Sequence, residues 1–403
     1  MLRRDFLMFT AALAVGGIAG PGAAWAADTP GVTATEIKIG QTQSYSGPTS
    51  AYGVIGKLQA AYFNMLNAQG GINGRKINFI SLDDGYSPPK TVEVTRRLVE
   101  QDEVAFVFNS LGTPTNSAVQ KYLNQKKVPQ LFVATGGDKW GDPERFPWTM
   151  GFQTSYRAEA QIYAKYILAE KPNAKIGLLY QNDDFGKDYI NGVRDVLGAE
   201  RFAKMVTSVS YESTDATVDS QLVSLKGGGN DVLLTATSPK FAAMSIRKAR
   251  DLAWTPLHLM SNVSTSVAAV IEPAGKENAI GMISADYRKD ATDPTWKDDA
   301  GLKQWRDFMN TQMPGADQAD NNYTYAYSVT LALVQVLKQC GNDLSRANIM
   351  KQAANLQPLE LPTLLPGITV STSPTNFHPM RQLQLQRWDG KTWVLFGKVI
   401  SAD

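Results

Sequence analysis

The sequence has little of the chemistry that metalloenzymes and disulfide-rich proteins use. It contains one cysteine, Cys340, and two histidines, His258 and His378. A single cysteine cannot form an internal disulfide, and Cys340 ends an apolar helical segment, so we expect a small buried hydrophobic residue. Neither histidine has a partner at metal-ligand spacing, and we expect ordinary core or surface imidazoles. We therefore expect no catalytic residues, no metal site and no cofactor.

A large excess of charge of one sign is also absent. The chain has 40 lysines and arginines against 38 aspartates and glutamates, a formal net charge of +2. This balance gives no electrostatic reason to bind nucleic acid or an anionic membrane surface. After residue 26, no apolar run approaches the roughly 20 residues that a membrane-spanning helix needs.

Three short motifs are weak signals of chemistry. Gly227-Gly228-Gly229 follows a predicted helix and precedes a strand, the reverse of the order in a phosphate-binding loop. The carboxylate pairs Asp83-Asp84 and Asp183-Asp184 lie at strand ends, where α/β proteins bind ligands. They have no nucleophile or acid–base partner in the sequence, and helix N-capping is the commoner role of such residues.

The first 26 residues read as an export signal. Arg3-Arg4-Asp5-Phe6-Leu7 precedes an apolar run, and Ala24-Trp25-Ala26 is a small-x-small cleavage site. The paired arginines favour the twin-arginine route, with general secretion as the alternative. Either route delivers a chain that begins near Ala27, and no cysteine at the cleavage site is available to carry a lipid. We expect a soluble periplasmic protein.

Strand-like and helix-like segments alternate along the rest of the chain. Removal of residues 1–26 leaves 377 of 403 residues, enough for about two domains. The patterns predict strands at 37–40, 76–82, 104–108, 130–134, 174–180, 205–211, 231–235, 257–260 and 280–285. They predict helices at 51–68, 91–101, 116–125, 158–170, 187–197, 220–226, 240–252, 265–271, 299–312 and 321–339. This order indicates the α/β class, with two doubly wound lobes of parallel strands and a C-terminal hairpin around Asp389-Gly390.

The tract from Glu36 to Arg75 forms one strand, turn and helix unit. A short strand leads into Ser46-Gly47-Pro48, Tyr52-Gly53 follows, and the helix ends at Gly70-Gly71 before Asn73-Gly74 turns the chain into the next strand. In order and spacing, this tract resembles the start of the solute-binding proteins of branched-chain amino acid type ABC importers.

The resemblance implies a type I periplasmic-binding-protein fold, in which a three-stranded hinge joins two lobes. Carried over, lobe 1 is 29–148 plus 286–379, and lobe 2 is 149–285 plus 380–403. The partners it implies are a small organic ligand and the membrane permease subunits of an ABC importer, with the binding protein itself a monomer.

Ligands of open α/β sheets bind beyond the carboxyl ends of the strands, so we look for the site there. The loop after the first strand holds Tyr45 and Tyr52. The loop after 104–108 starts a helix and is similar to the family's serine–threonine loop, which holds the ligand carboxylate. The matching residues are Ser110, Leu111, Gly112 and Thr113, although N-capping also explains Ser110.

Two more loops complete the predicted site. The loop at 134–138 resembles the family's second loop, and Thr135 and Gly136 are the matching residues. The segment at 182–186 resembles the family's D-x-x-[YF]-G motif, whose aromatic residue closes over the ligand; Phe185 takes that position. Each aromatic residue of the predicted site also has a simpler explanation as core packing.

The ligand class follows from a missing acid. Amino-acid binders of this family hold the ammonium with a carboxylate in the loop that here reads Ser261-Asn262-Val263-Ser264. A buried ammonium without a counter-charge would cost several kcal/mol. We therefore expect a small aromatic or keto carboxylate, with Asn262 as a contact. A branched-chain or other amino acid is the alternative, with Asp138, Asp183 or Asp184 supplying the charge.

Three function classes remain. Capture of a solute for an ABC importer is the first. A ligand-sensing receptor module is the second, and the predicted signal peptide without a membrane span or output domain argues against it. An exported enzyme is the third, and no flavin, pterin or metal motif supports it.

Overall fold

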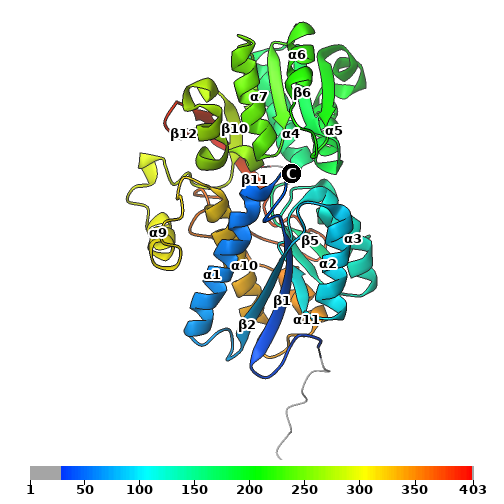
Figure 1. Cartoon of the computed structure of the whole chain (residues 1–403), viewed down its shortest axis with the longest axis vertical. Coiled ribbons are helices and arrows are strands. Elements are labelled where there is room, and N and C mark those ends of the chain that lie inside the picture. The colour runs from blue at the N-terminus through cyan, green and yellow to red at the C-terminus, as the bar shows by residue number, and fades with distance from the viewer. Residues whose placement is uncertain (1–28, 402–403) are drawn as a thin grey trace, which may run out of the picture.

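The computed structural model describes residues 29–401, which form two β-sheets with helices packed on their faces (Figure 1). The predicted export signal at 1–26 lies outside the described residues. Strands of the first sheet run in the order β2-β1-β3-β4-β5, and those of the second in the order β12-β11-β10-β9-β8-β6-β7. All pairings are parallel except β10–β11 and β11–β12. The predicted α/β class with two parallel-sheet lobes is confirmed.

The first sheet and its early helices come from the N-terminal part of the chain. Their bounds are β1 (Glu36–Gln43), α1 (Gly53–Ala68), β2 (Lys76–Asp83), α2 (Pro88–Glu100), β3 (Phe106–Phe108), α3 (Thr113–Gln125), β4 (Gln130–Val133) and β5 (Thr149–Gly151). Short 3-10 turns lie at η1 (Ser50–Tyr52) and η2 (Asp138–Gly141).

The second sheet follows with the same alternation. Its elements are α4 (Tyr156–Glu170), β6 (Ile176–Gln181), α5 (Asp184–Met205), β7 (Val206–Tyr211), α6 (Asp219–Gly227), β8 (Val232–Ala236), α7 (Pro239–Asp251), β9 (Leu257–Met260) and β10 (Ile283–Asp286). The antiparallel strands β11 (Gln382–Trp388) and β12 (Trp393–Ser401) complete this sheet and form the predicted hairpin.

Within residues 29–401, the chain passes between the two sheets and their helices three times: after β5, after β10 and before β11. Between β10 and β11 the chain returns to the first sheet as α9 (Ala300–Gln312), α10 (Asn322–Cys340) and α11 (Arg346–Ala353). Helix α10 packs against α1 and α11 (Figure 1). Arg346 Nε and Nη2 donate to the carbonyls of Ala105 and Val104. We call β1–β5, α1–α3 and α9–α11 the first lobe, and α4–α7 with β6–β12 the second lobe. The residue boundaries predicted for the lobes stay a prediction.

The expected elements appear close to their predicted positions, with a few differences. The helix expected at 265–271 is present in part: after η3 (Asn262–Ser264), the chain forms a π-helical turn, η4 (Val267–Ile271), that continues as the short α8 (Glu272–Ala274). Strand β10 begins later than expected because Gly281 turns the chain at φ 87°. Strand β5 and helix α11 were not predicted.

Two further expectations concern Cys340 and membrane-spanning helices. Cys340 is buried at the end of α10, as expected. No helix within 29–401 is long and apolar enough to cross a bilayer.

A buried amide network holds the first lobe together. Gln41 Nε2 on β1 donates to Gln59 Oε1 on α1 (2.6 Å), and Gln59 Nε2 donates to Asn109 Oδ1 (2.8 Å). Asn109 Nδ2 in turn donates to the Phe132 carbonyl (2.6 Å) and the Tyr325 hydroxyl on α10 (2.8 Å). Asn109 adopts φ 51°, a left-handed conformation that asparagine tolerates better than most residues. One asparagine therefore connects α1, β4 and α10.

Replacing this asparagine should be costly. In Asn109→Ala, buried groups lose their partners, at about 1–3 kcal/mol for each group left unpaired. The matched control is Asn73→Ala, because Asn73 also has a positive φ (50°) but is exposed. Urea unfolding should show a much larger loss for Asn109→Ala, and equal losses would mean that the network adds nothing beyond backbone conformation.

Candidate functional site

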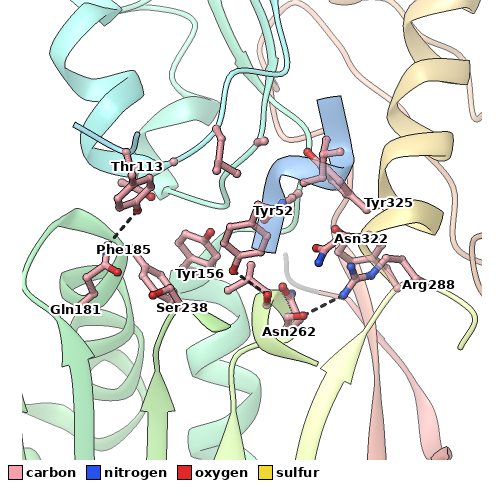
Figure 2. Close-up of a pocket in the computed structure, with 18 residues that line it drawn as sticks. Tyr52, Thr113, Tyr156, Gln181, Phe185, Ser238, Asn262, Arg288, Asn322 and Tyr325 are labelled. Carbon is pink, nitrogen blue, oxygen red and sulfur yellow. Dashed lines mark hydrogen bonds between the residues drawn. The ribbon is translucent and has the colours of Figure 1, made fainter. Parts of the chain in front are cut away.

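A small cavity lies between the lobes, at the carboxyl ends of the parallel strands (Figure 2). Its first-lobe wall consists of Tyr52, Ile55, Tyr86, Leu111, Gly112, Thr113, Ala134, Asn322 and Tyr325. The remaining wall comes from the second lobe and the crossovers: Gln153, Tyr156, Gln181, Phe185, Ser238, Asn262, Val263, Tyr287 and Arg288. The volume of the cavity is about 40 Å³, counted as the space open to the centre of a water molecule. One water needs about 10–15 Å³ by the same measure, so the cavity holds a small ligand or a few waters.

The start of α3 gives one end of the cavity a positive potential. Gly112 precedes the helix with φ 96°, and a side chain there would collide with the ring of Tyr86. Thr113 is the first helical residue, and its hydroxyl shares a 2.5 Å hydrogen bond with that of Thr135. The N-terminus of a helix carries free N–H groups and a partial positive charge. This end of the cavity is therefore suited to a carboxylate.

Aromatic rings form the middle of the cavity. The rings of Tyr156 and Phe185 lie 4.5 Å apart between centroids, and Tyr52 faces them from the first lobe (Figure 2). Burial raises the pKa of Tyr52 and Tyr156 above the ordinary tyrosine value, so both rings stay neutral. These faces suit an apolar or aromatic ligand body.

Two hydrogen bonds cross the cavity from lobe to lobe. The Tyr52 hydroxyl donates to the Val263 carbonyl (2.8 Å), and Gln181 Nε2 donates to the Tyr86 hydroxyl (3.1 Å). The structure therefore shows the lobes in contact around the cavity.

A buried ion pair stands where the chain leaves β10. Arg288 Nε and Nη2 donate to the two carboxylate oxygens of Asp286 at 2.8 and 2.7 Å, and the side chains are 4% and 3% exposed. Burial by itself would lower the pKa of Arg288, but the charge of Asp286 outweighs it and the pKa stays above its ordinary value. The guanidinium also donates to the carbonyls of Asn262 (2.9 Å) and Asn321 (3.4 Å), the N-cap of α10. The pair thus connects both lobes.

A second buried carboxyl, Glu159, lies behind the cavity wall. Its Oε1 accepts from the Tyr163 hydroxyl (2.6 Å) and from the backbone N–H of Asn262 (2.8 Å), and no cation within 29–401 pairs with it. Burial raises the pKa of Glu159 to about 7 despite these hydrogen bonds. Glu159 itself does not line the cavity.

Six of the ten predicted site residues line the cavity: Tyr52, Leu111, Gly112, Thr113, Phe185 and Asn262. They come from four loops and meet as the strand-end rule requires. Their contact with a ligand stays a prediction.

The structure does not bring the other four to the cavity wall. Tyr45 shares a 2.6 Å hydrogen bond with Ser81, beside α1. The Ser110 hydroxyl, in a residue 3% exposed, accepts from the N–H of Thr42 (3.0 Å). Thr135 and Gly136 lie behind the wall: Thr135 bonds the Thr113 hydroxyl, and the Gly136 carbonyl accepts from the N–H of Tyr156 (2.7 Å).

The acids considered for a ligand ammonium do not line the cavity either. Asp183 caps α5 by accepting from the N–H of Phe185 (2.9 Å), and burial raises its pKa to about 6. Asp184 pairs with Lys139 at 2.8 Å, and Asp138 accepts from the Ser155 hydroxyl at 2.6 Å.

Several lining residues were missed by sequence reasoning, and some had a usable signal. Tyr86, Gln181, Ser238 and Arg288 each lie at or just after the end of a parallel strand, where the rule already pointed. Asn322 and Tyr325 had no such signal, because they reach the cavity from the start of α10. The same holds for Ile55 on α1.

Comparison with known proteins places the chain among binding proteins. The sequence model of the periplasmic binding protein family matches residues 36–392. The chain is 21% identical over 381 residues to the Leu/Ile/Val-binding protein homolog 7 of Brucella abortus (strain 2308), covering 90% of this chain and 91% of the relative.

Solved structures show the same fold at low identity. A branched chain amino acid ABC transporter from Thermus thermophilus with bound valine superposes with a TM-score of 0.80 at 16% identity, covering 91% of this chain and 97% of the other. A fatty acid ABC transporter substrate-binding protein from Thermomonospora curvata gives 0.77 at 20% identity, covering 93% and 95%.

Loss of the buried guanidinium should destabilise the protein strongly. Arg288→Leu leaves the Asp286 carboxylate buried without its partner, which typically costs about 3–5 kcal/mol. Lys303→Leu is the matched control, because Lys303 pairs with Asp307 at the same 2.8 Å but with both side chains exposed. Denaturant unfolding should give less than about 1 kcal/mol for the control. Similar losses in the two variants would contradict a special role for the buried pair.

Glu159 should make stability depend on pH. Its pKa is raised from 4.5 to about 7 in the folded chain, so between these values the folded state holds a proton that the unfolded state has lost. Its contribution to stability is therefore full below about pH 4.5 and is lost as pH rises towards 7. Glu159→Gln should flatten this part of the stability profile, whereas the exposed control Glu200→Gln should not. Unfolding measured from pH 5 to 8 tests this, and parallel profiles for Glu159→Gln and wild type would disprove it.

Proposed function

This chain belongs to the periplasmic binding protein family of the branched-chain amino acid type, and we propose that it captures a small organic acid between its lobes for an ABC importer. The observation that carries the proposal is the cavity at the strand ends of both sheets, bridged by Tyr52–Val263 and Tyr86–Gln181 hydrogen bonds. The lobes, 29–148 with 286–379 and 149–285 with 380–403, rotate about their crossovers to admit and release the ligand.

The proposed ligand carries a carboxylate at the start of α3. Gly112 and Thr113 line that end, and the helix terminus favours negative charge. Thr113 takes the anchoring role that the sequence suggested for Ser110, because Thr113 lines the cavity whereas Ser110 does not.

The body of the ligand is aromatic or a keto acid chain. Tyr52, Tyr156 and Phe185 surround the middle of the cavity, and no carboxylate from residues 29–401 lines it. Arg288, the single charged residue among these lining residues, is neutralised by Asp286. An ammonium would be buried there without a counter-charge, which is costly, whereas a neutral aromatic or keto group needs no counter-charge.

A branched-chain or other amino acid is the second candidate. The relatives named for leucine, isoleucine and valine, and the valine-bound Thermus structure, favour it. In that case a group behind the wall, such as Glu159, supplies the charge that the wall lacks.

The same proposal covers location and partners. The chain acts in the periplasm as a monomer and docks on the permease subunits of the importer. It binds its ligand without converting it, which distinguishes it from an exported enzyme. It delivers the ligand to an importer, which distinguishes it from a ligand-sensing receptor module.

A ligand panel tests the proposed class. Titration calorimetry of the wild type should give micromolar or tighter binding, about −8 kcal/mol, for an aromatic acid such as phenylacetate or a keto acid such as phenylpyruvate. Leucine and valine should bind far more weakly. If leucine or valine binds more tightly than every acid without an amine, the amino-acid alternative is correct.

With the tightest ligand of the panel, Thr113→Val should weaken binding by about 1.5–3 kcal/mol, the range for hydrogen bonds to charged groups. Ser110→Ala is the control from the same loop and should change affinity less, because its hydroxyl serves Thr42. A larger effect at Ser110 than at Thr113 would return the anchoring role to Ser110.

A further inference from the structure

The side chain of Asn262 is buried against the cavity without a hydrogen-bond partner. The residue is 1% exposed, and neither Nδ2 nor Oδ1 is paired within residues 29–401. Asn262 lines the cavity wall, near Tyr52 and Arg288 (Figure 2). A buried amide in this state carries an unmet demand for both an acceptor and a donor.

The main chain of the same residue is held firmly. Its N–H donates to Glu159 Oε1 (2.8 Å), and its carbonyl accepts from Arg288 Nη2 (2.9 Å) and the Thr265 hydroxyl (2.8 Å). Because hydrogen bonds hold both the N–H and the carbonyl of this residue, its backbone keeps the amide in place at the cavity wall before a ligand binds. Exchanging the positions of Nδ2 and Oδ1 does not alter this conclusion, since both atoms lack a hydrogen-bond partner within residues 29–401.

The unpaired amide of Asn262 favours some ligand groups over others, according to how many of its atoms each group can pair with. An apolar group would leave both amide atoms unpaired, and a keto oxygen would satisfy the N–H alone. An ammonium only donates, so it would leave the amide N–H unpaired. A hydroxyl or a primary carboxamide both donates and accepts, so it can pair with both amide atoms.

We infer that Asn262 determines specificity by pairing with a hydroxyl or carboxamide on the ligand, at a distance from the carboxylate bound near Thr113. The two residues lie apart in Figure 2, with Tyr52 and Tyr156 drawn between them. The inference rests on the proposed function, because it assigns the far end of the same ligand. The ligand class becomes a hydroxylated or amide-bearing organic acid.

Matched ligand pairs test this inference in the full-length protein. The pairs are 4-hydroxyphenylacetate with phenylacetate, 4-hydroxybenzoate with benzoate, and threonine with valine, which covers the amino-acid alternative. By calorimetry, the hydroxylated member of at least one pair should bind wild type about tenfold or more tightly, because a site built to bond a hydroxyl rejects its analogue.

Asn262→Leu should abolish that preference, because leucine is similar in size and has no amide. Asn322→Leu is the control at the same cavity: the amide of Asn322 is already paired with Asp320 Oδ1 (2.8 Å), so the preference should survive. Equal affinities within every pair that binds wild type, or a preference that persists in Asn262→Leu, would overturn the inference and leave the proposed capture function standing.

Failure of the proposed ligand class gives a different result. If no compound of the panel binds, that class is wrong, and the unliganded proteins decide the role of Asn262. An amide that serves only a ligand is not needed for folding, so Asn262→Leu should melt at or above the wild-type temperature. A fall in melting temperature as large as that of Asn109→Ala would assign Asn262 to the fold and overturn the inference.

Discussion

The arrangement of the cavity depends on the buried pair of Asp286 and Arg288. Burying two charges is costly, and it is tolerated only when the geometry is good and the remaining donors are used. Here two parallel hydrogen bonds join the charges, and the other guanidinium N–H groups reach the Asn262 carbonyl and the N-cap of α10. The pair therefore fixes three parts of the chain at one point: the end of β10, the loop after β9 and a helix of the first lobe.

Further contacts join the lobes besides this pair. Two neutral hydrogen bonds cross the cavity, the Ser266 hydroxyl donates to Asp320 Oδ1 (2.9 Å), and the N–H of Asp138 donates to Asp188 Oδ2 (2.8 Å), whereas the Lys139–Asp184 ion pair is partly exposed and therefore weak. A ligand shifts the equilibrium between open and closed states by its difference in affinity for the two. A closed cleft that ligands stabilise is what capture and release require.

The polarity of the cavity argues for a particular kind of solute. One end has a helix terminus, the middle has aromatic faces, and the far end has the unpaired amide of Asn262. The acids nearby are committed elsewhere: Asp183 caps a helix, Asp286 holds Arg288, and Glu159 serves backbone and Tyr163. Relatives named for leucine, isoleucine and valine binding are similar to this chain, and the ligand class that we propose rests instead on the chemistry of this wall.

The sequence by itself determined the fold class, most strands and helices, and the loops where six lining residues lie, because periodicity and turn residues act locally and parallel strands end at one edge. It could not tell Ser110 from Thr113, since both follow the same strand and only the tertiary structure decides that Ser110 faces the backbone of β1 while Thr113, the first residue of α3, lines the cavity. It also predicted a helix at 265–271 without its 3-10 and π-helical turns, and it gave no sign that Asn322 and Tyr325 would reach the cavity from α10. Those features were decided by the tertiary structure alone, because they arise from packing between segments that lie far apart in the chain.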